Sequence, residues 1–289
     1  MSILTITDVR PTPGDSAFLL DDGTTAILCD TGFGFTGAAL VEKLRCVLGD
    51  RTLDYILLTH SHYDHALGTP YVVRAYPDVQ VVAGSYARTI FAKPTARAAM
   101  ADMDRKAARN TGAGEYEDLT GELKVDLAVE DGQTFFCGSR KVVAIALPGH
   151  TKCSLGYYFP EEKLLAAPET LGVFFGDDIY LPSCLVGYEM TLESIRKAGA
   201  LDLERILVPH YGEIGREEAK HYLQRSDEVV RETARTIMEL YGAGKTTEEI
   251  VDYFTETSYS QQVAPAYPID AFRLNTGIMA QRIRKELEE

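Results

Sequence analysis

Three of the chain's six histidines lie within six consecutive positions, in the segment THSHYDH at residues 59–65. His60, His62 and Asp64 alternate along an extended backbone, so their side chains point to one face, and His65 joins them if the chain turns into a helix. Neutral imidazole nitrogens and carboxylate oxygens are ligands for zinc, iron and manganese. The spacing H-x-H-x-D-H therefore predicts a metal site.

Two more histidines follow predicted strands. His150 ends the segment VVAIALPGH, and His210 ends RILVPH. Open α/β layers place their ligand sites at the carboxyl ends of strands, which makes both residues candidates for the same site. The sixth histidine, His221, falls in the middle of a helical pattern, and we expect it to be a solvated helix residue.

The five strand-end histidines and Asp64 are enough for two metal ions, which need about six ligands between them. One expected set is His60, His62 and His150. The other is Asp64, His65 and His210. A carboxylate between the ions is still required, and Glu169, at the end of the predicted strand KLLAAPET, is the candidate. Its alternative role is that of a salt-bridged or capping residue.

The elements that position these residues alternate between strands and helices in the first part of the chain. Apolar runs predict strands at residues 16–20, 24–29, 53–59 and 79–84, and helical patterns lie at 36–48 and 67–77. A hairpin is expected at 154–170, with PEEK as its turn, and a strand at 205–209. Such alternation is typical of a layered α/β core.

Two segments have a helical pattern of their own. Residues 85–115 are rich in alanine and broken at Pro94, and we interpret them as an insert. From residue 215 the pattern is almost wholly helical, so we predict a catalytic domain at 1–214 and a helical appendage at 215–289. Aromatic residues in these segments are expected to pack rather than line a pocket. They are Tyr86, Phe91, Tyr116 and Tyr253.

Composition limits the partners. The formal charge of −14 and the pI near 4.9 disfavour a nucleic-acid partner. No signal-peptide pattern and no apolar stretch of about 20 residues is present, so no membrane association is expected. The five scattered cysteines are typical of reduced thiols in a cytoplasmic protein. We therefore expect a cytoplasmic protein with a small-molecule substrate; a homo-oligomer is left open.

The order THSHYDH, PGHT, the carboxylate of APET and VPHYG resembles that of the metallo-β-lactamase superfamily, over about residues 5–215. The resemblance implies an α/β fold, the four-layer αβ/βα sandwich, with metals at one edge and here a C-terminal helical extension. It also implies that Asp30 of CDTG lies beside the metal loop and orients a ligand. The layout is similar to that of glyoxalase II-like and quorum-signal-associated thioesterase-like members.

Two residues depart from the superfamily pattern. Glu169 stands where the superfamily usually has Asp, and its extra methylene moves the carboxylate by about 1.5 Å. Glu169 bridges both ions, binds one only, or leaves the second site weak. Cys153 lies three residues after His150, but its spacing does not make it a convincing ligand, since a thiolate must reach the ion at about 2.3 Å.

The predicted function is that of a dinuclear metallohydrolase. A metal-bound hydroxide would attack a small ester, thioester or lactone, because a metal lowers the pKa of its water to about 7. Asp64 is the candidate general acid and base. Two divalent ions are expected, zinc in the first place, with iron and manganese as alternatives. Tyr180, in a loop predicted at 173–183, is a candidate for a hydrogen bond to the substrate.

Two other functions are left open. One is that of a metallo-phosphodiesterase, since the same attack is possible at a phosphoryl centre. The other is that of a metal-bound effector or binding protein with weak catalysis, which the departure at Glu169 favours.

Overall fold

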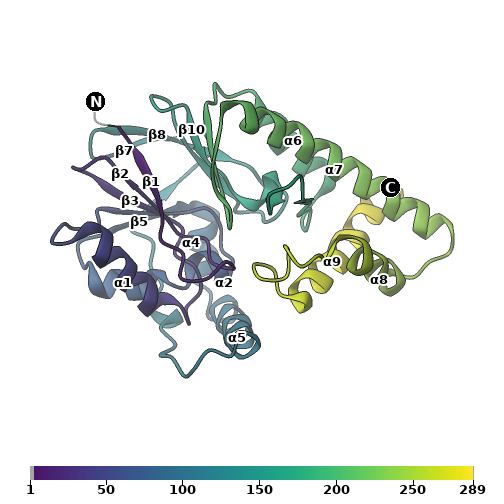
Figure 1. Cartoon of the computed structure of the whole chain (residues 1–289), viewed down its shortest axis with the longest axis horizontal. Helices are drawn as coiled ribbons and strands as arrows, with labels where there is room; N and C mark the ends of the chain where they lie inside the picture. Colours follow the sequence, from purple (N-terminus) through teal and green to yellow (C-terminus); the bar gives the residue numbers. More distant parts are fainter. Residues whose placement is uncertain (1–2, 289) are drawn as a thin grey trace.

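Two six-stranded β-sheets form the centre of the computed structural model, which describes residues 3–288 (Figure 1). The first sheet has the order β1-β2-β3-β4-β5-β6; it is antiparallel from β1 to β3 and parallel from β3 to β6. Its strands are β1 (Thr5–Asp8), β2 (Phe18–Asp21), β3 (Ala26–Cys29), β4 (Tyr55–Leu58), β5 (Gln80–Gly84) and β6 (Leu127–Val129).

The second sheet has the order β14-β13-β10-β9-β8-β7, and only β10 and β13 pair in parallel. Its strands are β7 (Thr134–Cys137), β8 (Arg140–Ala146), β9 (Leu155–Phe159), β10 (Leu164–Ala166), β13 (Arg205–Val208) and β14 (Gly212–Gly215). The predicted hairpin is confirmed, with Phe159 opposite Leu164. Strand β14 was not predicted, because a strand with two glycines and one buried apolar residue, Ile214, has almost no strand pattern.

The two sheets pack face to face around one buried apolar cluster. Its members include Phe18, Ile27, Leu57 and Val82 from the first sheet, and Ala144, Tyr157, Leu164 and Leu207 from the second. Along β4, Leu57 faces this cluster while Ile56 and Leu58 face the helices, because successive side chains of a strand alternate. Strand β4 is therefore buried on both faces, which explains its continuous apolar run.

Helices cover the outer face of each sheet. On the first sheet, α1 (Gly37–Leu48) and α3 (Thr69–Ala75) bury Leu40, Leu44 and Val72. On the second, α6 (Tyr188–Gly199) and α7 (Arg216–Gly242) bury Leu192 and Tyr222. Full burial of such a side chain contributes about 1.5–3 kcal/mol. Helix, sheet, sheet and helix make the predicted four-layer sandwich, which is confirmed.

The segment predicted as an insert is helical. It contains α4 (Ser85–Phe91) and α5 (Pro94–Thr111), and Pro94 stands in the first turn of α5, where a missing N–H costs nothing. The buried carboxylate of Asp104 accepts a hydrogen bond of 2.9 Å from the backbone N–H of Gly34 and so ties α5 to the loop after β3.

The C-terminal part consists of α7, α8 (Thr247–Ser258) and α9 (Ile269–Glu288). A capping box of Thr246 and Glu249 begins α8. The Glu286 carboxylate on α9 accepts hydrogen bonds from the backbone N–H groups of Tyr188, at 2.9 Å, and Glu189, which caps α6 and docks the last helix onto the sandwich. One apolar cluster joins the second sheet to α7, α8 and α9, so the core continues across residue 215. The division at 214/215 stays a prediction.

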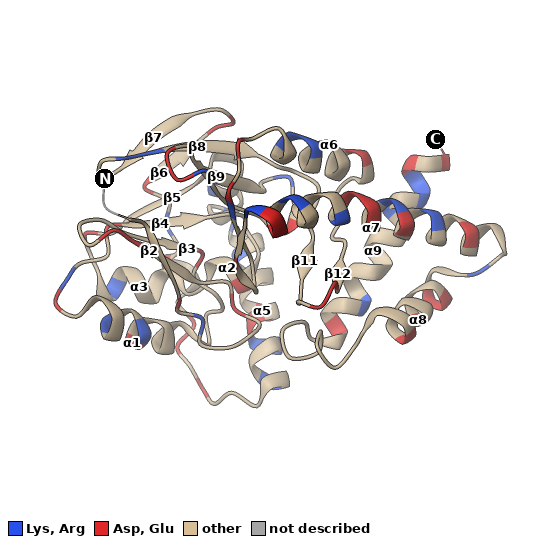
Figure 2. Ribbon diagram, turned by 45° about the horizontal axis from the view of Figure 1, so that its top comes forward, with Lys and Arg blue, Asp and Glu red and all other residues tan. Residues whose placement is uncertain are grey.

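Charged residues of both signs alternate along the exposed face of α7 (Figure 2). Several form pairs one turn apart, such as Arg231 with Asp227 at 2.7 Å. No helix within residues 3–288 is both long enough and apolar enough to cross a membrane.

Candidate metal centre

The carboxyl end of β4 presents the histidine-rich segment. The backbone stays extended through His62, and α2 (Tyr63–Ala66) begins directly after it. This turn brings His65 back towards His60, so that their ring centroids lie 4.0 Å apart. The helix start expected from the sequence gathers these side chains. Because α2 begins before Asp64, this carboxylate lies on the helix with His65 and not on an extended backbone with His60 and His62, as had been expected.

Three strands of the second sheet supply the other residues. His150 follows β8, Glu169 follows β10 and His210 follows β13. These strands run in the same direction, because β8 and β10 both pair antiparallel with β9 and β13 is parallel to β10. Their carboxyl ends consequently lie at one edge, opposite the end of β4.

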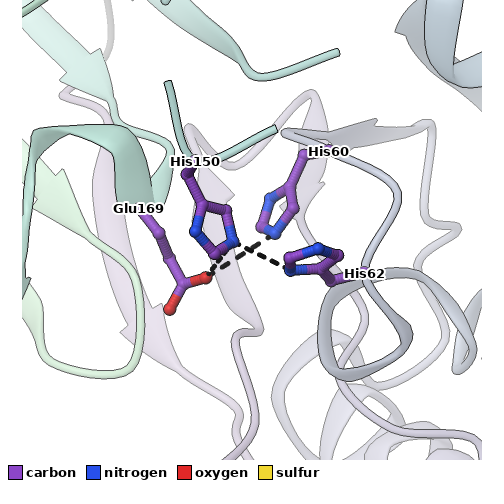
Figure 3. A group of neighbouring side chains, drawn as sticks. All are labelled: His60, His62, His150 and Glu169. Carbon is purple, nitrogen blue, oxygen red and sulfur yellow. Dashed lines mark hydrogen bonds and ion pairs between the residues drawn. The ribbon is translucent and has the colours of Figure 1, made fainter. Parts of the chain in front are cut away.

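The first group consists of His60, His62, His150 and Glu169, whose ligand atoms all lie within 4.8 Å of one another (Figure 3). Oε2 of Glu169 is 2.7 Å from Nε2 of His150 and 3.7 Å from Nε2 of His60. Nε2 of His150 is also 2.8 Å from Nδ1 of His62. Figure 3 shows the three rings and the carboxylate converging on one point.

The second group consists of Asp64, His65 and His210, again within 4.8 Å. Nε2 of His65 is 3.2 Å from Nε2 of His210, and Oδ2 of Asp64 lies 3.8 Å from the former and 3.9 Å from the latter. The structure thus brings the seven predicted ligands together in the two sets expected, with Glu169 in the first.

Glu169 also contacts the second group. While Oε2 faces His150, Oε1 lies 3.3 Å from Nε2 of His210, and Oε2 is 3.8 Å from Nε2 of His65. One carboxylate therefore lies between the two sets of donors.

The donor atoms fit metal ions. Nε2 of His60 is buried without a hydrogen-bond partner among the described residues, and such groups are rare in proteins. Burial and the neighbouring histidines lower the pKa of His60 and His62 well below the ordinary value, so both rings stay neutral. Neutral imidazoles that direct lone pairs at one another and at a carboxylate form a site for a cation.

Asp30 orients His65, as the resemblance implied. Its buried carboxylate accepts hydrogen bonds from Nδ1 of His65, at 2.7 Å, from the backbone N–H of Thr59 and from Ser16. Burial lowers the pKa of His65, but the carboxylates of Asp30 and Asp64 outweigh it and raise this pKa to about 9. The interaction fixes the ring so that Nε2 points to the centre.

Two further ring contacts were not predicted. Nδ1 of His150 lies 2.5 Å from the hydroxyl of Ser183, and Nδ1 of His210 lies 3.1 Å from the backbone carbonyl of Asp15. Both partners are distant in sequence from the rings they orient. No motif marks Ser183, and a backbone carbonyl carries no sequence signal at all.

The structure places Tyr180 away from the ligands. The predicted loop at 173–183 contains a two-stranded sheet of β11 (Val173–Phe174) and β12 (Tyr180–Leu181). The Tyr180 ring packs on Phe174 and Tyr222, and it lines a second cavity rather than the one over the ligands. A hydrogen bond from Tyr180 to a substrate stays a prediction; Val173 and Phe175 of the same segment line the first cavity.

Cys153 and His221 lie outside the two ligand groups. The Cys153 thiol is 3.2 Å from the hydroxyls of both Ser61 and Thr151. His221 is exposed on α7 and lies 3.2 Å from Asp178, as expected for a solvated helix residue.

The four aromatic residues that were expected to pack do not line the cavity over the ligands. Phe91 is buried in the core, whereas Tyr86 and Tyr253 are 49% and 40% exposed and therefore pack only in part, Tyr253 against Phe254.

A cavity of about 230 Å³ opens over the ligands. His62, Asp64, His150, Glu169 and His210 form its floor. Apolar side chains from the loop after β3, from α5, from β11 and from the segment 266–278 form its walls. The arrangement is that of a small-molecule site with polar groups gathered at one end.

Comparison with known proteins agrees with this geometry. A family model described as Metallo-beta-lactamase superfamily matches residues 11–210. The chain is 25% identical over 166 residues to an atrochrysone carboxyl ACP thioesterase of Cryptosporiopsis sp., covering 57% of this chain and 38% of the relative. It is 26% identical over 196 residues to a hydroxyacylglutathione hydrolase of Bartonella quintana, covering 65% and 62%. The chain thus spans less than two thirds of either relative.

Solved structures show the same fold. A metallo-beta-lactamase family protein from Thermus thermophilus superposes with a TM-score of 0.64 at 19% identity, over 98% of this chain and 93% of that one. A superfamily protein from Sulfolobus tokodaii gives a TM-score of 0.59 at 17% identity, over 80% and 86%.

Proposed function

Because the chain belongs to the metallo-β-lactamase superfamily, we propose that it is a hydrolase with a two-ion metal centre that cleaves a small ester, thioester or lactone. The observation that carries the proposal is the position of Glu169 between the two sets of donors, with one oxygen 2.7 Å from His150 and the other 3.3 Å from His210. A single ion would not need a carboxylate that contacts both sets.

Each ion has its own ligands in this proposal. His60, His62 and His150 would hold one ion, Asp64, His65 and His210 would hold the other, and Glu169 would serve both sets. Zinc suits nitrogen and oxygen donors of this kind, with iron and manganese as alternatives. Bound ions supply Lewis acidity and bring the pKa of a coordinated water to about 7.

The chain's own residues position the reactants. The carboxylate of Asp64 faces the cavity and is the proposed acceptor and donor of the proton. The apolar walls hold the substrate and exclude bulk water, which strengthens electrostatic interactions at the floor. The names of the two relatives, an ACP thioesterase and a hydroxyacylglutathione hydrolase, place thioesters among the candidate substrates.

The first test combines metal analysis with a substrate panel. We expect about two ions per chain and turnover of an ester, a thioester or a lactone that a chelator abolishes. Faster turnover of bis(p-nitrophenyl) phosphate than of any carboxylic substrate would establish a phosphodiesterase instead. Two bound ions without any turnover would indicate a binding protein.

Glu169→Gln tests the bridge. The amide keeps the size of the side chain but loses the negative charge that would face both cations. We therefore expect the metal content to fall to about one ion per chain and kcat/KM to fall by at least 100-fold. Glu161→Gln, at an exposed position in the same hairpin, is the matched control. Two tightly held ions in Glu169→Gln would contradict the bridging role.

A further inference from the structure

The walls of the cavity over the ligands carry no charge. Apart from the floor, the lining is apolar or uncharged, and within residues 3–288 it includes no lysine or arginine. Tyr63, Tyr267 and Asn275 supply the polar atoms. The Asn275 amide donates to the Tyr267 hydroxyl at 2.6 Å, which leaves the phenolic proton available for a hydrogen bond to a substrate.

The mouth of this cavity is apolar as well. Met103 on α5 and Leu274 and Ile278 on α9 all line it, and their side chains are 38%, 52% and 38% exposed. Large exposed apolar side chains that gather at one opening mark a binding site for an apolar group.

The cations that line the two neighbouring cavities are already paired. Lys106 lies in a shallow neighbouring cavity, where its ammonium is 3.4 Å from Asp270. Arg225 lies in the second cavity, which shares Leu185, Tyr267 and Asn275 with the first, and it pairs with Glu228 and Glu232 at 3.1 and 3.2 Å. Neither cation is available to a carboxylate on a substrate without the loss of an existing ion pair.

A charged substrate would therefore lose its hydration without compensation. Burying a carboxylate is unfavourable unless a cation or several hydrogen bonds replace the water. Ions on the floor would engage the bond to be cleaved, not the remote carboxylates of a glutathione conjugate. The net charge of −14 adds a repulsion for anions.

We propose that the part of the substrate enclosed by the cavity walls is uncharged and that the substrate carries an apolar acyl group, so that glutathione conjugates are poor substrates. This inference rests on the proposed hydrolase function and narrows its substrate class. Under this proposal the chain does not share the activity for which the Bartonella relative is named, although the two sequences are similar.

The test uses one acyl group on two thiols. Octanoyl thioesters of N-acetylcysteamine and of glutathione react alike: water adds its oxygen to the acyl carbon, the C–S bond breaks and the thiol takes up a proton. With the metal-loaded protein, we expect kcat/KM for the uncharged thioester to exceed that for the glutathione thioester by at least tenfold. Equal or faster turnover of the glutathione thioester would overturn the inference and leave the hydrolase intact.

Binding separates the two proposals if neither thioester is cleaved. S-octyl-N-acetylcysteamine and S-octylglutathione are the matching non-reactive thioethers, and calorimetry should find the former at least tenfold tighter. Tighter binding of the glutathione thioether would refute the substrate class. Absent turnover of every substrate would refute only the hydrolase.

A charge placed at the mouth provides a second test. Leu274→Arg adds an unpaired cation at an exposed lining position, so we expect the preference for the uncharged thioester to fall at least threefold. Leu287→Arg, also on α9 and 45% exposed but outside the lining, is the matched control. An unchanged preference in Leu274→Arg would count against the inference.

Discussion

At the scale of single residues, three rings of the candidate centre contact a partner through Nδ1: His65 with Asp30, His150 with Ser183 and His210 with the backbone carbonyl of Asp15. The ligands themselves were predictable from the H-x-H-x-D-H spacing and from strand ends, although Asp64 lies in α2 and not on the extended face expected for it. The partners that orient the rings were mostly not predictable. Ser183 reaches its ring through tertiary folding alone.

Asp30 provides a prediction at this scale. Asp30→Asn keeps the size of the side chain and tolerates the backbone, since asparagine adopts a positive φ like the 56° found here. It removes the charge that holds His65 at 2.7 Å, so we expect metal affinity at the second set to fall by roughly 10–100-fold. Competition with a fluorescent chelator would measure this. Unchanged affinity with an unchanged circular dichroism spectrum would refute the orienting role.

Asp104 predicts a pH dependence of stability. Burial raises the pKa of this carboxyl group from 3.8 to about 6. Between pH 4 and pH 6 the folded chain keeps a proton that the unfolded chain releases, so stability falls as the pH rises through this window. A shift of about two units corresponds to about 3 kcal/mol.

The Asp104→Asn variant should lack this loss of stability between pH 4 and pH 6. From pH 4 to pH 7, the unfolding free energy of the original chain should fall by about 2–3 kcal/mol more than that of the variant. Urea denaturation at each pH measures both free energies. Because both chains experience the same metal loss in acid, the difference isolates the carboxyl group. Parallel pH profiles would show that Asp104 ionises normally.

At the scale of elements, close backbone approaches decide where the ligands lie. Gly149, which precedes His150, has φ of 144°, and a Cβ there would lie 2.3 Å from the Thr191 hydroxyl on α6. The turn after β8 can therefore be this tight only with glycine. The sequence could not reveal this requirement, because the opposing residue comes from a helix about 40 residues later.

Gly149→Ala should accordingly displace His150. We expect a loss of about 2–4 kcal/mol in unfolding free energy together with weaker metal binding, measured by denaturation and metal analysis. Gly199→Ala, at a position where an added Cβ meets nothing within 4 Å, is the control and should retain full metal content. If the two variants had the same unfolding free energy and the same metal content, the turn at Gly149 would not be what positions His150.

At the scale of the whole molecule, a buried ion cluster joins the two sheets at the edge opposite the metal centre. Arg140 at the start of β8 pairs with Asp22, in the turn after β2, at 2.9 Å, and with Glu162, in the turn before β10. All three side chains are largely buried. The two sheets are thus connected by this ion cluster at one edge and meet at the candidate ligands at the other.

Removing the cation should destabilise the whole fold. Arg140→Met leaves two carboxylates buried without it, so we expect unfolding free energy to fall by about 3–5 kcal/mol. The neighbouring Lys141→Met, at an exposed position, should change it by less than about 0.5 kcal/mol. Folded Arg140→Met should still bind its metal ions. A loss below about 1 kcal/mol would show that the cluster adds little.

The sandwich as a whole could be predicted from the order of the motifs, but the cavity could not. Its walls combine α5, β11 and α9, which are far apart in the sequence and meet only once the last helix has docked through Glu286. Helical periodicity predicts that α9 exists, not which face covers the ligands.

The position of the cavity wall in the chain has a consequence for biosynthesis. All seven candidate ligands lie at or before residue 210, whereas the wall segment at 266–278 follows them. The ribosome therefore synthesises all of the candidate ligand residues before it synthesises α9. Metal ions can enter the nascent chain through an open face, and the substrate site takes shape only afterwards.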